Sequence, residues 1–231
     1  WSGAKMPDEA VKILYDSNCN IGSTYGTTES SASVTFATKD STSLEIMTNT
    51  IGKAVPDGDV RIANEEKICA VGETGEIQIR QEYSLSGYLN NPEATKAAFT
   101  KDGWYRTGDL GNIRQDGNIE FTSRMSEMFV SGGYNVYPLE VEQALEAHEA
   151  VAICAVIDVA DDVYGEVGWA YIIEKPGSDL TPDTIKEFAY SQMANFKVPR
   201  KFIISAQLPM LPIGKIDKVN LKKMAQTEMM S

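Results

Sequence analysis

Three short stretches of the chain combine charged or hydroxyl side chains with glycine or proline, and each could bind a polar or charged ligand. The first is residues 102–111, in which Asp109 follows Gly108 in what looks like a Thr-Gly turn. A carboxylate beside a glycine, where the backbone can come close, suits hydrogen bonds from a pair of ligand hydroxyls such as those of a ribose. Aspartate is also common in turns for purely local reasons, so Asp109 taken alone leaves both interpretations open.

The second stretch, residues 21–30, is rich in glycine and hydroxyl side chains and has a carboxylate, Glu29, near its end. Backbone N–H groups and hydroxyls in such a loop can approach phosphate oxygens, and the carboxylate can hold a hard cation such as Mg²⁺. It is not a Walker loop, because no Gly-Lys-Ser/Thr follows. The alternative is an ordinary polar turn.

The third stretch lies near the end of the chain, at residues 208–218. Pro209, Pro212 and Gly214 stiffen and turn the backbone, which is expected to aim Lys215 outward as a single point charge. A lysine held in such a loop suits the gripping of an anion. A purely solubilising lysine is the alternative.

Composition limits the classes of partner. The 231 residues carry a formal net charge of −12, which argues against a broad basic face for nucleic acid. No apolar run approaches a membrane span and no signal peptide is visible. Cys19, Cys69 and Cys154 are far apart, which gives no metal spacing and predicts a reducing, cytoplasmic location. His148, the one histidine, is expected to be structural.

The surrounding sequence predicts an α+β protein in two parts. The first part is strand-rich, with alternating apolar residues and turns. Its expected elements are helices over 7–15 and 91–99 and strands over 60–62, 76–80 and 117–121. The second part reads as an α+β unit with a glycine hairpin or tight turn at 131–135. Its expected elements are helices over 138–147 and 181–195, with Leu139, Val141 and Leu145 inward on the first, and strands over 150–159, 168–174 and 202–204.

These stretches, in this order, resemble the adenylate-forming enzymes: acyl-CoA synthetases, luciferases and the adenylation domains of peptide synthetases. The resemblance rests on segments at 25–29, 74–77, 87–93, 103–109, 124–135 and 212–217. It implies that residues 1–122 are the strand-rich C-terminal part of the large AMP-binding domain and 123–231 the small mobile domain. The phosphate loop of that family lies upstream of the 25–29 motif. The chain, which begins at Trp1, is therefore expected to be part of a longer enzyme and inactive by itself.

In that family a carboxylic acid attacks ATP to give an acyl-adenylate, and the thiol of CoA then takes the acyl group. The resemblance assigns Tyr25, Gly26, Thr28, Asp109 and Arg124 to ATP and AMP, with Tyr25 on the adenine, Thr28 at the phosphate and Asp109 on the ribose. It also implies that Glu29 holds Mg²⁺ and that Lys215 bridges carboxylate and phosphate oxygens during adenylation. Glu29 and Lys215 are thus the catalytic candidates.

The remaining roles concern the second step. Gly132, Gly133 and Tyr134 are expected along the CoA path, where a missing Cβ leaves room for the pantetheine chain. Ser126 takes the hinge position, although the family usually has Asp or Lys there. The resulting hypothesis is an AMP-forming acid–CoA ligase that uses ATP, Mg²⁺ and CoA. A non-catalytic fragment and a peptide-synthetase adenylation domain remain as alternatives, and the acid and a homodimeric assembly are left open.

Overall fold

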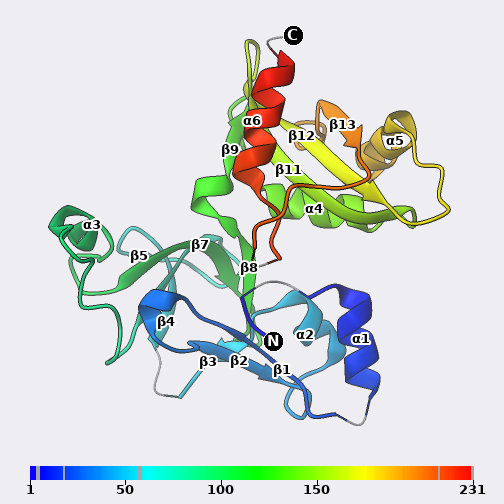
Figure 1. Ribbon diagram of the computed structural model, residues 1–231. Helices are drawn as coiled ribbons and strands as arrows, with labels where there is room; N and C mark the ends of the chain where they lie inside the picture. Colours follow the sequence, from blue (N-terminus) through cyan, green and yellow to red (C-terminus); the bar gives the residue numbers. More distant parts are fainter. Residues whose placement is uncertain (4–5, 18, 57–58, 213, 230–231) are drawn as a thin grey trace. The chain divides into compact units, whose positions relative to one another are not determined.

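The computed structural model describes residues 1–3, 6–17, 19–56, 59–212 and 214–229 (Figure 1). The chain divides into two units, residues 1–125 and 126–231, each with its own internal contacts. The α+β class expected from the sequence is confirmed. The assignment of residues 1–122 and 123–231 to a large and a small domain stays a prediction.

The first unit consists of short strands and helices. In order they are α1 (Asp8–Asp16), β1 (Gly22–Tyr25), the 3₁₀ turn η1 (Thr28–Ser30), β2 (Thr35–Thr38), α2 (Leu44–Asn49), β3 (Lys53–Ala54), β4 (Asp59–Asn64), β5 (Lys67–Ile68), β6 (Gly75–Arg80), α3 (Pro92–Ala97), β7 (Tyr105–Ile113) and β8 (Ile119–Arg124). The strands form two antiparallel sheets, of order β1-β2-β3 and β5-β4-β6-β7-β8. Ile62, Ile77, Ile79 and Tyr105 form the centre of a core cluster between these elements.

The segment around Asp109 is a strand and not the turn that the sequence suggested. Residues 76 and 78 of β6 pair with residues 110 and 106 of β7, so β7 carries two extra residues at this point. Gly108 takes a φ of +71° there, a conformation that glycine adopts without the steric cost of a side chain. The Thr-Gly pair therefore makes a bulge inside a continuous strand, which re-aims the side chains next to it.

The second unit is built on one mixed sheet. Its elements are the 3₁₀ turn η2 (Met125–Glu127), β9 (Phe129–Ser131), β10 (Tyr134–Val136), α4 (Pro138–Glu146), β11 (Val151–Asp161), β12 (Gly165–Glu174), α5 (Pro182–Gln192), β13 (Lys201–Ile204) and α6 (Lys218–Met229). The strands follow the order β10-β9-β12-β11, and β13 pairs with β12 in parallel. The hairpin predicted at 131–135 is confirmed as the β9–β10 turn.

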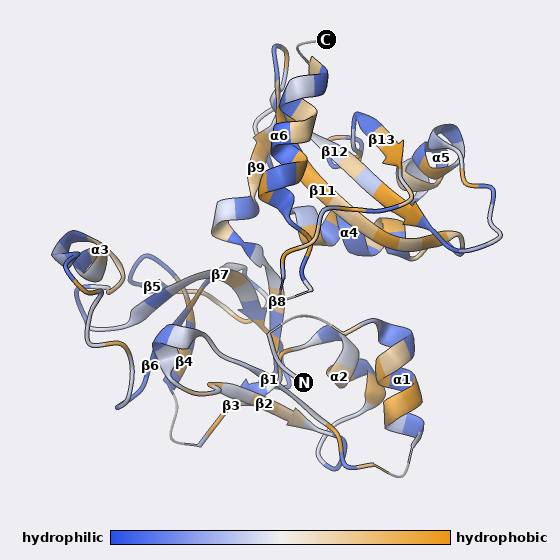
Figure 2. Ribbon diagram, viewed as in Figure 1, coloured by the Kyte–Doolittle hydropathy of each residue, from blue (hydrophilic) through white to orange (hydrophobic). Residues whose placement is uncertain are grey.

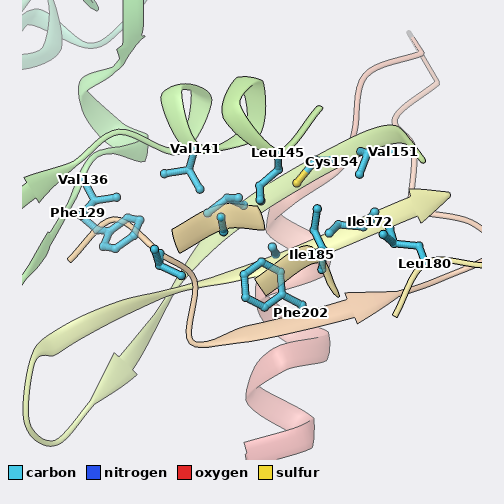
Figure 3. Packing of buried hydrophobic residues seen from close by; sticks show 14 residues of the cluster. Phe129, Val136, Val141, Leu145, Val151, Cys154, Ile172, Leu180, Ile185 and Phe202 are labelled. Atoms are coloured by element: carbon cyan, nitrogen blue, oxygen red, sulfur yellow. The ribbon is translucent and has the colours of Figure 1, made fainter. Parts of the chain in front are cut away.

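Helices cover both faces of this sheet. Val141 and Leu145 of α4 and Ile185 of α5 pack on one face with Cys154 and Ile172, as Figure 3 shows. Leu221 and Ala225 of α6 cover the other face. Both sides of β11 are thus buried, which explains the nearly continuous apolar run of this strand in Figure 2.

Two expectations for this unit need correction, and one helix was not expected. Helix α5 ends at Gln192 and not near residue 195, because Met193 is already extended. Helix α6 was not predicted, since it buries only two side chains and its hydrophobic periodicity is weak. On α4, Leu139 is half-buried and Glu142 is buried in its place. The carboxylate of Glu142 is compensated there by a hydrogen bond from the backbone N–H of Val156, at 2.8 Å.

Candidate functional site

The first unit brings together three of the predicted nucleotide residues. Tyr25 at the end of β1 donates its hydroxyl to Oδ2 of Asp109 at 2.6 Å. Nε of Arg124 lies 3.4 Å from Oδ1 of the same carboxylate. Asp109 and Arg124 are paired positions on β7 and β8, whereas Tyr25 comes from the other sheet. Asp109 is only 3% exposed, so the cluster presents a fixed carboxylate and not a mobile surface group.

The electrostatics of this cluster keep Tyr25 as a hydrogen-bond donor. Burial raises the pKa of Tyr25 far above its usual value, and the charge and hydrogen bond of Asp109 raise it further. The bulge is held by Thr107, whose hydroxyl accepts the Asp109 N–H at 3.0 Å and donates to the carbonyl of Ile77 at 2.6 Å. A tyrosine that stays protonated and a pinned backbone together fix the direction of the carboxylate.

The hydroxyl-rich loop after Tyr25 is also preformed. Thr27 and Ser30 make a reciprocal capping box across η1, which leaves Thr28 exposed. A Cβ added at Gly26 would lie 2.5 Å from the carbonyl oxygen of Ala32, so the close approach of the two backbone segments requires glycine. The loop can therefore offer the Thr28 hydroxyl to a ligand without rearranging.

Glu29 lies in the same 3₁₀ turn, η1, and its side chain is hydrogen-bonded to Tyr88. Its carboxylate Oε1 accepts a hydrogen bond from the hydroxyl of Tyr88 at 3.1 Å, and its carbonyl accepts from Leu85 N at 2.7 Å. No group of three or more His, Cys, Asp or Glu side chains within the described residues is arranged to hold a metal ion. A single carboxylate fits Mg²⁺, which usually keeps several waters and binds through one or two carboxylates plus substrate phosphates.

Lys215 lies in the second unit, in a hairpin-like loop. Leu211 N donates to the carbonyl of Lys215 at 2.7 Å, and Asp217 N donates to the carbonyl of Pro209 at 2.8 Å. The Lys215 side chain is exposed and forms no hydrogen bond or ion pair with the described part of the chain. Position 213 of this motif lies outside the described residues. The expectation of an outward-pointing lysine on a shaped loop agrees with this geometry.

The other predicted residues of the second unit lie in η2, in the turn between β9 and β10, and on β10. Gly132 and Gly133 occupy the β9–β10 turn with φ values of +56° and +87°. A Cβ would meet the ring of Tyr164 at 3.1 Å at Gly132, whereas nothing lies within 4 Å at Gly133. Tyr134 is 60% exposed and stacks on Phe196 with ring centroids 4.7 Å apart. Ser126 is an exposed member of η2.

Sequence reasoning missed two side chains that shape the first unit's site. Thr107 pins the bulge, and Tyr88 holds the carboxylate of Glu29. Both lie within the segments 103–109 and 87–93, but their hydrogen-bond partners Ile77 and Glu29 are 30 and 59 positions away, so residue spacing alone does not pair them. His148 has the structural role expected: its ring packs edge-on against Phe188 at 4.8 Å, and Nδ1 accepts from Ala150 N.

Two protein-family models match this chain. Residues 1–89 match the AMP-binding enzyme family and residues 140–215 match the AMP-binding enzyme C-terminal domain. The chain belongs to this adenylate-forming superfamily.

Individual relatives and a solved structure support the same superfamily. The chain is 42% identical over 199 residues to a "3-[(3aS,4S,7aS)-7a-methyl-1,5-dioxo-octahydro-1H-inden-4-yl]propanoyl:CoA ligase" of Rhodococcus jostii, covering 86% of this chain and 36% of the relative. It is 32% identical over 221 residues to a long-chain fatty acid–CoA ligase of Mycobacterium tuberculosis, covering 96% and 43%. The crystal structure of ATP-bound MatB from Rhodopseudomonas palustris matches with a TM-score of 0.89 at 28% identity, covering 96% and 44%. The chain thus spans less than half the length of these proteins.

Proposed function

We propose that this chain is the C-terminal part of an AMP-forming acid–CoA ligase. The activity is the conversion of a carboxylic acid and ATP to an acyl-adenylate and pyrophosphate, followed by transfer of the acyl group to CoA. The observation that carries the proposal is the buried carboxylate of Asp109, fixed by Tyr25 and Arg124 beside a hydroxyl-rich loop. The names of the relatives, which are CoA ligases, support the choice of CoA as acceptor.

Each residue of the first unit has a role that follows from its chemistry. Asp109 accepts hydrogen bonds from the ribose hydroxyls, and Tyr25 lies against the adenine. Thr28 donates to a phosphate oxygen from a loop that is already ordered. Glu29 would hold Mg²⁺ together with the phosphates, and the ion would supply charge neutralisation there.

Lys215 supplies the second positive charge. The adenylation transition state spreads negative charge over phosphate and carboxylate oxygens, so a positioned ammonium stabilises it more than the ground state. Gly132 and Gly133 leave the β9–β10 turn without side chains, which suits the passage of the pantetheine arm. Ser126 is proposed as the hinge that lets the second unit serve both steps.

The test is a pair of separate half-reactions in the full-length protein. Exchange of pyrophosphate into ATP, measured with a panel of fatty, aryl and alicyclic acids, reports adenylation. Formation of a CoA thioester from the matching acyl-adenylate reports the second step. Exchange without thioester formation would instead favour a peptide-synthetase adenylation domain, and the absence of both would favour a non-catalytic role.

Two finer expectations stay proposals of the same kind. A cytoplasmic location is proposed from the cysteines, which are all unpaired: Cys19, Cys69 and Cys154. A part in fatty acid metabolism is proposed from one relative's name. No helix of the described segments is long and apolar enough to cross a membrane.

A further inference from the structure

The first residue of α6, Lys218, lies between two carboxylates from different elements. Its Nζ is 2.6 Å from Oε2 of Glu127 in η2 and 2.8 Å from Oε1 of Glu142 in α4. The side chains of Lys218 and Glu142 are 24% and 10% exposed, so solvent screens this cluster less than an exposed pair. Glu142 also accepts the backbone N–H of Val156 in β11, which fixes the cluster to the sheet.

Lys218 does not stabilise helix α6 from this position. A cation in the first turn opposes the helix dipole, and the start of α6 is already capped by Asp217, whose carboxylate accepts the N–H of Asn220 at 2.9 Å. Burial by itself would lower the pKa of Lys218, but the charges of Glu142 and Glu127 outweigh it and raise the pKa. The ammonium is therefore held by the two carboxylates and not by local helix energetics.

The cluster joins two segments whose roles are proposed to be linked. Lys218 follows Lys215 by three residues, and the hairpin that carries Lys215 is closed by the Asp217–Pro209 backbone hydrogen bond directly before Lys218. Glu127 follows Ser126 by one residue. One side chain therefore ties the base of the lysine hairpin to the segment next to the hinge position.

We propose that Lys218 is a positioning residue that couples the Lys215 hairpin to η2, so that the hinge segment and the ammonium of Lys215 move together. The inference rests on the function proposed above, since it assigns the orientation of Lys215 in the adenylation step. Lys218 itself touches no substrate in this proposal. Its effect passes through the backbone of residues 209–217, at whose end it is anchored.

The coupling is tested without activity by hydrogen–deuterium exchange of the 231-residue chain. Lys218→Met should speed amide exchange on the order of tenfold both in residues 125–131 and in residues 209–217, because local opening of each segment becomes easier. The matched control is Lys222→Met on the same helix, which removes the 2.7 Å pair with Asp158. This control should leave both segments unchanged. Equal effects of the two variants, or faster exchange in α6 alone, would overturn the coupling.

A second pair of variants guards against misfolding. Lys218→Met leaves the buried carboxylate of Glu142 without its cation, which can unfold the unit. The double variant Lys218→Met with Glu142→Gln removes that charge, and the amide oxygen can still accept the Val156 N–H. It should show the same faster exchange in both segments. Glu127→Gln cuts only the arm to η2 and should speed exchange in both segments to a smaller extent. If the folded double variant exchanges like the parent, the proposal fails.

Activity of the full-length protein gives the remaining readout. Lys218→Met should lower the kcat of adenylation about tenfold and leave the KM for ATP unchanged, because the residues proposed to bind ATP before reaction, Tyr25, Thr28 and Asp109, lie in the first unit. Lys218→Arg should restore the rate to within about twofold, since the guanidinium can bridge both carboxylates. A raised KM with unchanged kcat would contradict a positioning role. If the parent shows no adenylation yet the exchange coupling is present, the proposed function fails and the coupling stands.

Discussion

Asp109 and Lys215, the two charged groups proposed to meet the nucleotide, are held in opposite ways. Asp109 is buried, accepts the Tyr25 hydroxyl and pairs with Arg124. Lys215 is exposed, and only the backbone of its hairpin is fixed by hydrogen bonds. One group belongs to the folded core of its unit, whereas the other has a defined place on the chain and a side chain that pairs with none of the described residues.

This contrast separates ground-state binding from transition-state stabilisation. A carboxylate that is already oriented loses little freedom on binding, so it can bind ATP before and during reaction alike. A free ammonium gains most when negative charge develops on the oxygens near it. We therefore expect changes at Asp109 to act on ATP affinity and changes at Lys215 to act on rate.

The largest expected effect is that of Lys215→Ala in the full-length protein. Removal of this charge, which the hairpin backbone brings to a defined place on the chain, should lower adenylation by roughly 10²–10³-fold, the range expected when one electrostatic donor to the transition state is lost. Thioester formation from supplied acyl-adenylate should change little. Single-turnover assays of each half-reaction measure this. Lys223→Ala, at an exposed lysine of α6, is the control and should act like the parent. Equal loss in both half-reactions would point to a general folding role for Lys215.

The next effect is that of Asp109→Asn, which removes the charge but keeps the shape. Loss of a charged acceptor should raise the KM for ATP by roughly 10- to 100-fold, in line with hydrogen bonds to ionised groups. The kcat at saturating ATP should fall much less. Initial rates across ATP concentrations decide between these outcomes. Asp116→Asn, in the exposed turn after β7, is the control. An unchanged KM would remove Asp109 from the proposed nucleotide site.

A smaller and more selective effect is expected of Ser126→Pro. Proline fixes φ near −65° and removes an N–H, which should restrict rotation at the proposed hinge. Adenylation should stay near the parental rate while thioester formation slows by about tenfold or more. Ser126→Ala, which keeps the backbone free, should behave like the parent. Parental rates in both half-reactions of a folded proline variant would place the hinge elsewhere.

The smallest expected effect is on the thermal stability of the first unit, through the carboxylate of Asp102. Hydrogen bonds from Arg61 and Thr100 lower the pKa of Asp102 to about 2. Because this lies below the ordinary value of 3.8, the contribution to stability is present above about pH 4 and is lost as the pH falls toward 2. Asp102→Asn should therefore lower Tm by roughly 1–3 °C at pH 7 and by much less near pH 2, where the carboxylate is about half protonated.

Thermal melts between pH 2 and 7 check this prediction, with Asp59→Asn as the control. Asp59 pairs with Arg80 at 2.8 Å, and both side chains are more than half exposed. That pair should contribute less at pH 7, because Arg80 is 53% exposed whereas Arg61, the partner of Asp102, is 11% exposed. A destabilisation by Asp102→Asn that is as large at pH 2 as at pH 7 would assign the effect to something other than this carboxylate's charge.

Much of the local structure followed from the sequence. The helix over 92–97 begins where Asn91 and Pro92 predicted, and the Asn91 side chain accepts the N–H of Ala94. The glycine pair at 132–133 makes the expected turn. These features depend on neighbours within about four residues, so residue type and spacing are enough to predict them.

What the sequence did not predict depends on contacts across long separations. The Tyr25–Asp109 hydrogen bond joins residues 84 positions apart, and the Lys218–Glu127 pair joins residues 91 apart. From the sequence alone Asp109 is either a turn residue or a ligand-binding carboxylate beside a Thr-Gly turn, because Thr-Gly-Asp is turn-like locally. Its place in β7 follows from pairing with β6 and β8, which absorbs the extra residues as a bulge.

The sequence by itself determined the residue types, their order and the short-range elements, and with them the superfamily. Only the tertiary structure decided which charges are fixed and which are free. Burial and the hydrogen bonds of distant partners make Asp109 a rigid acceptor, and Lys218 is held by two carboxylates from other elements. The physical reason is that the strength of a charge interaction depends on its surroundings, and those surroundings exist only when the chain is folded.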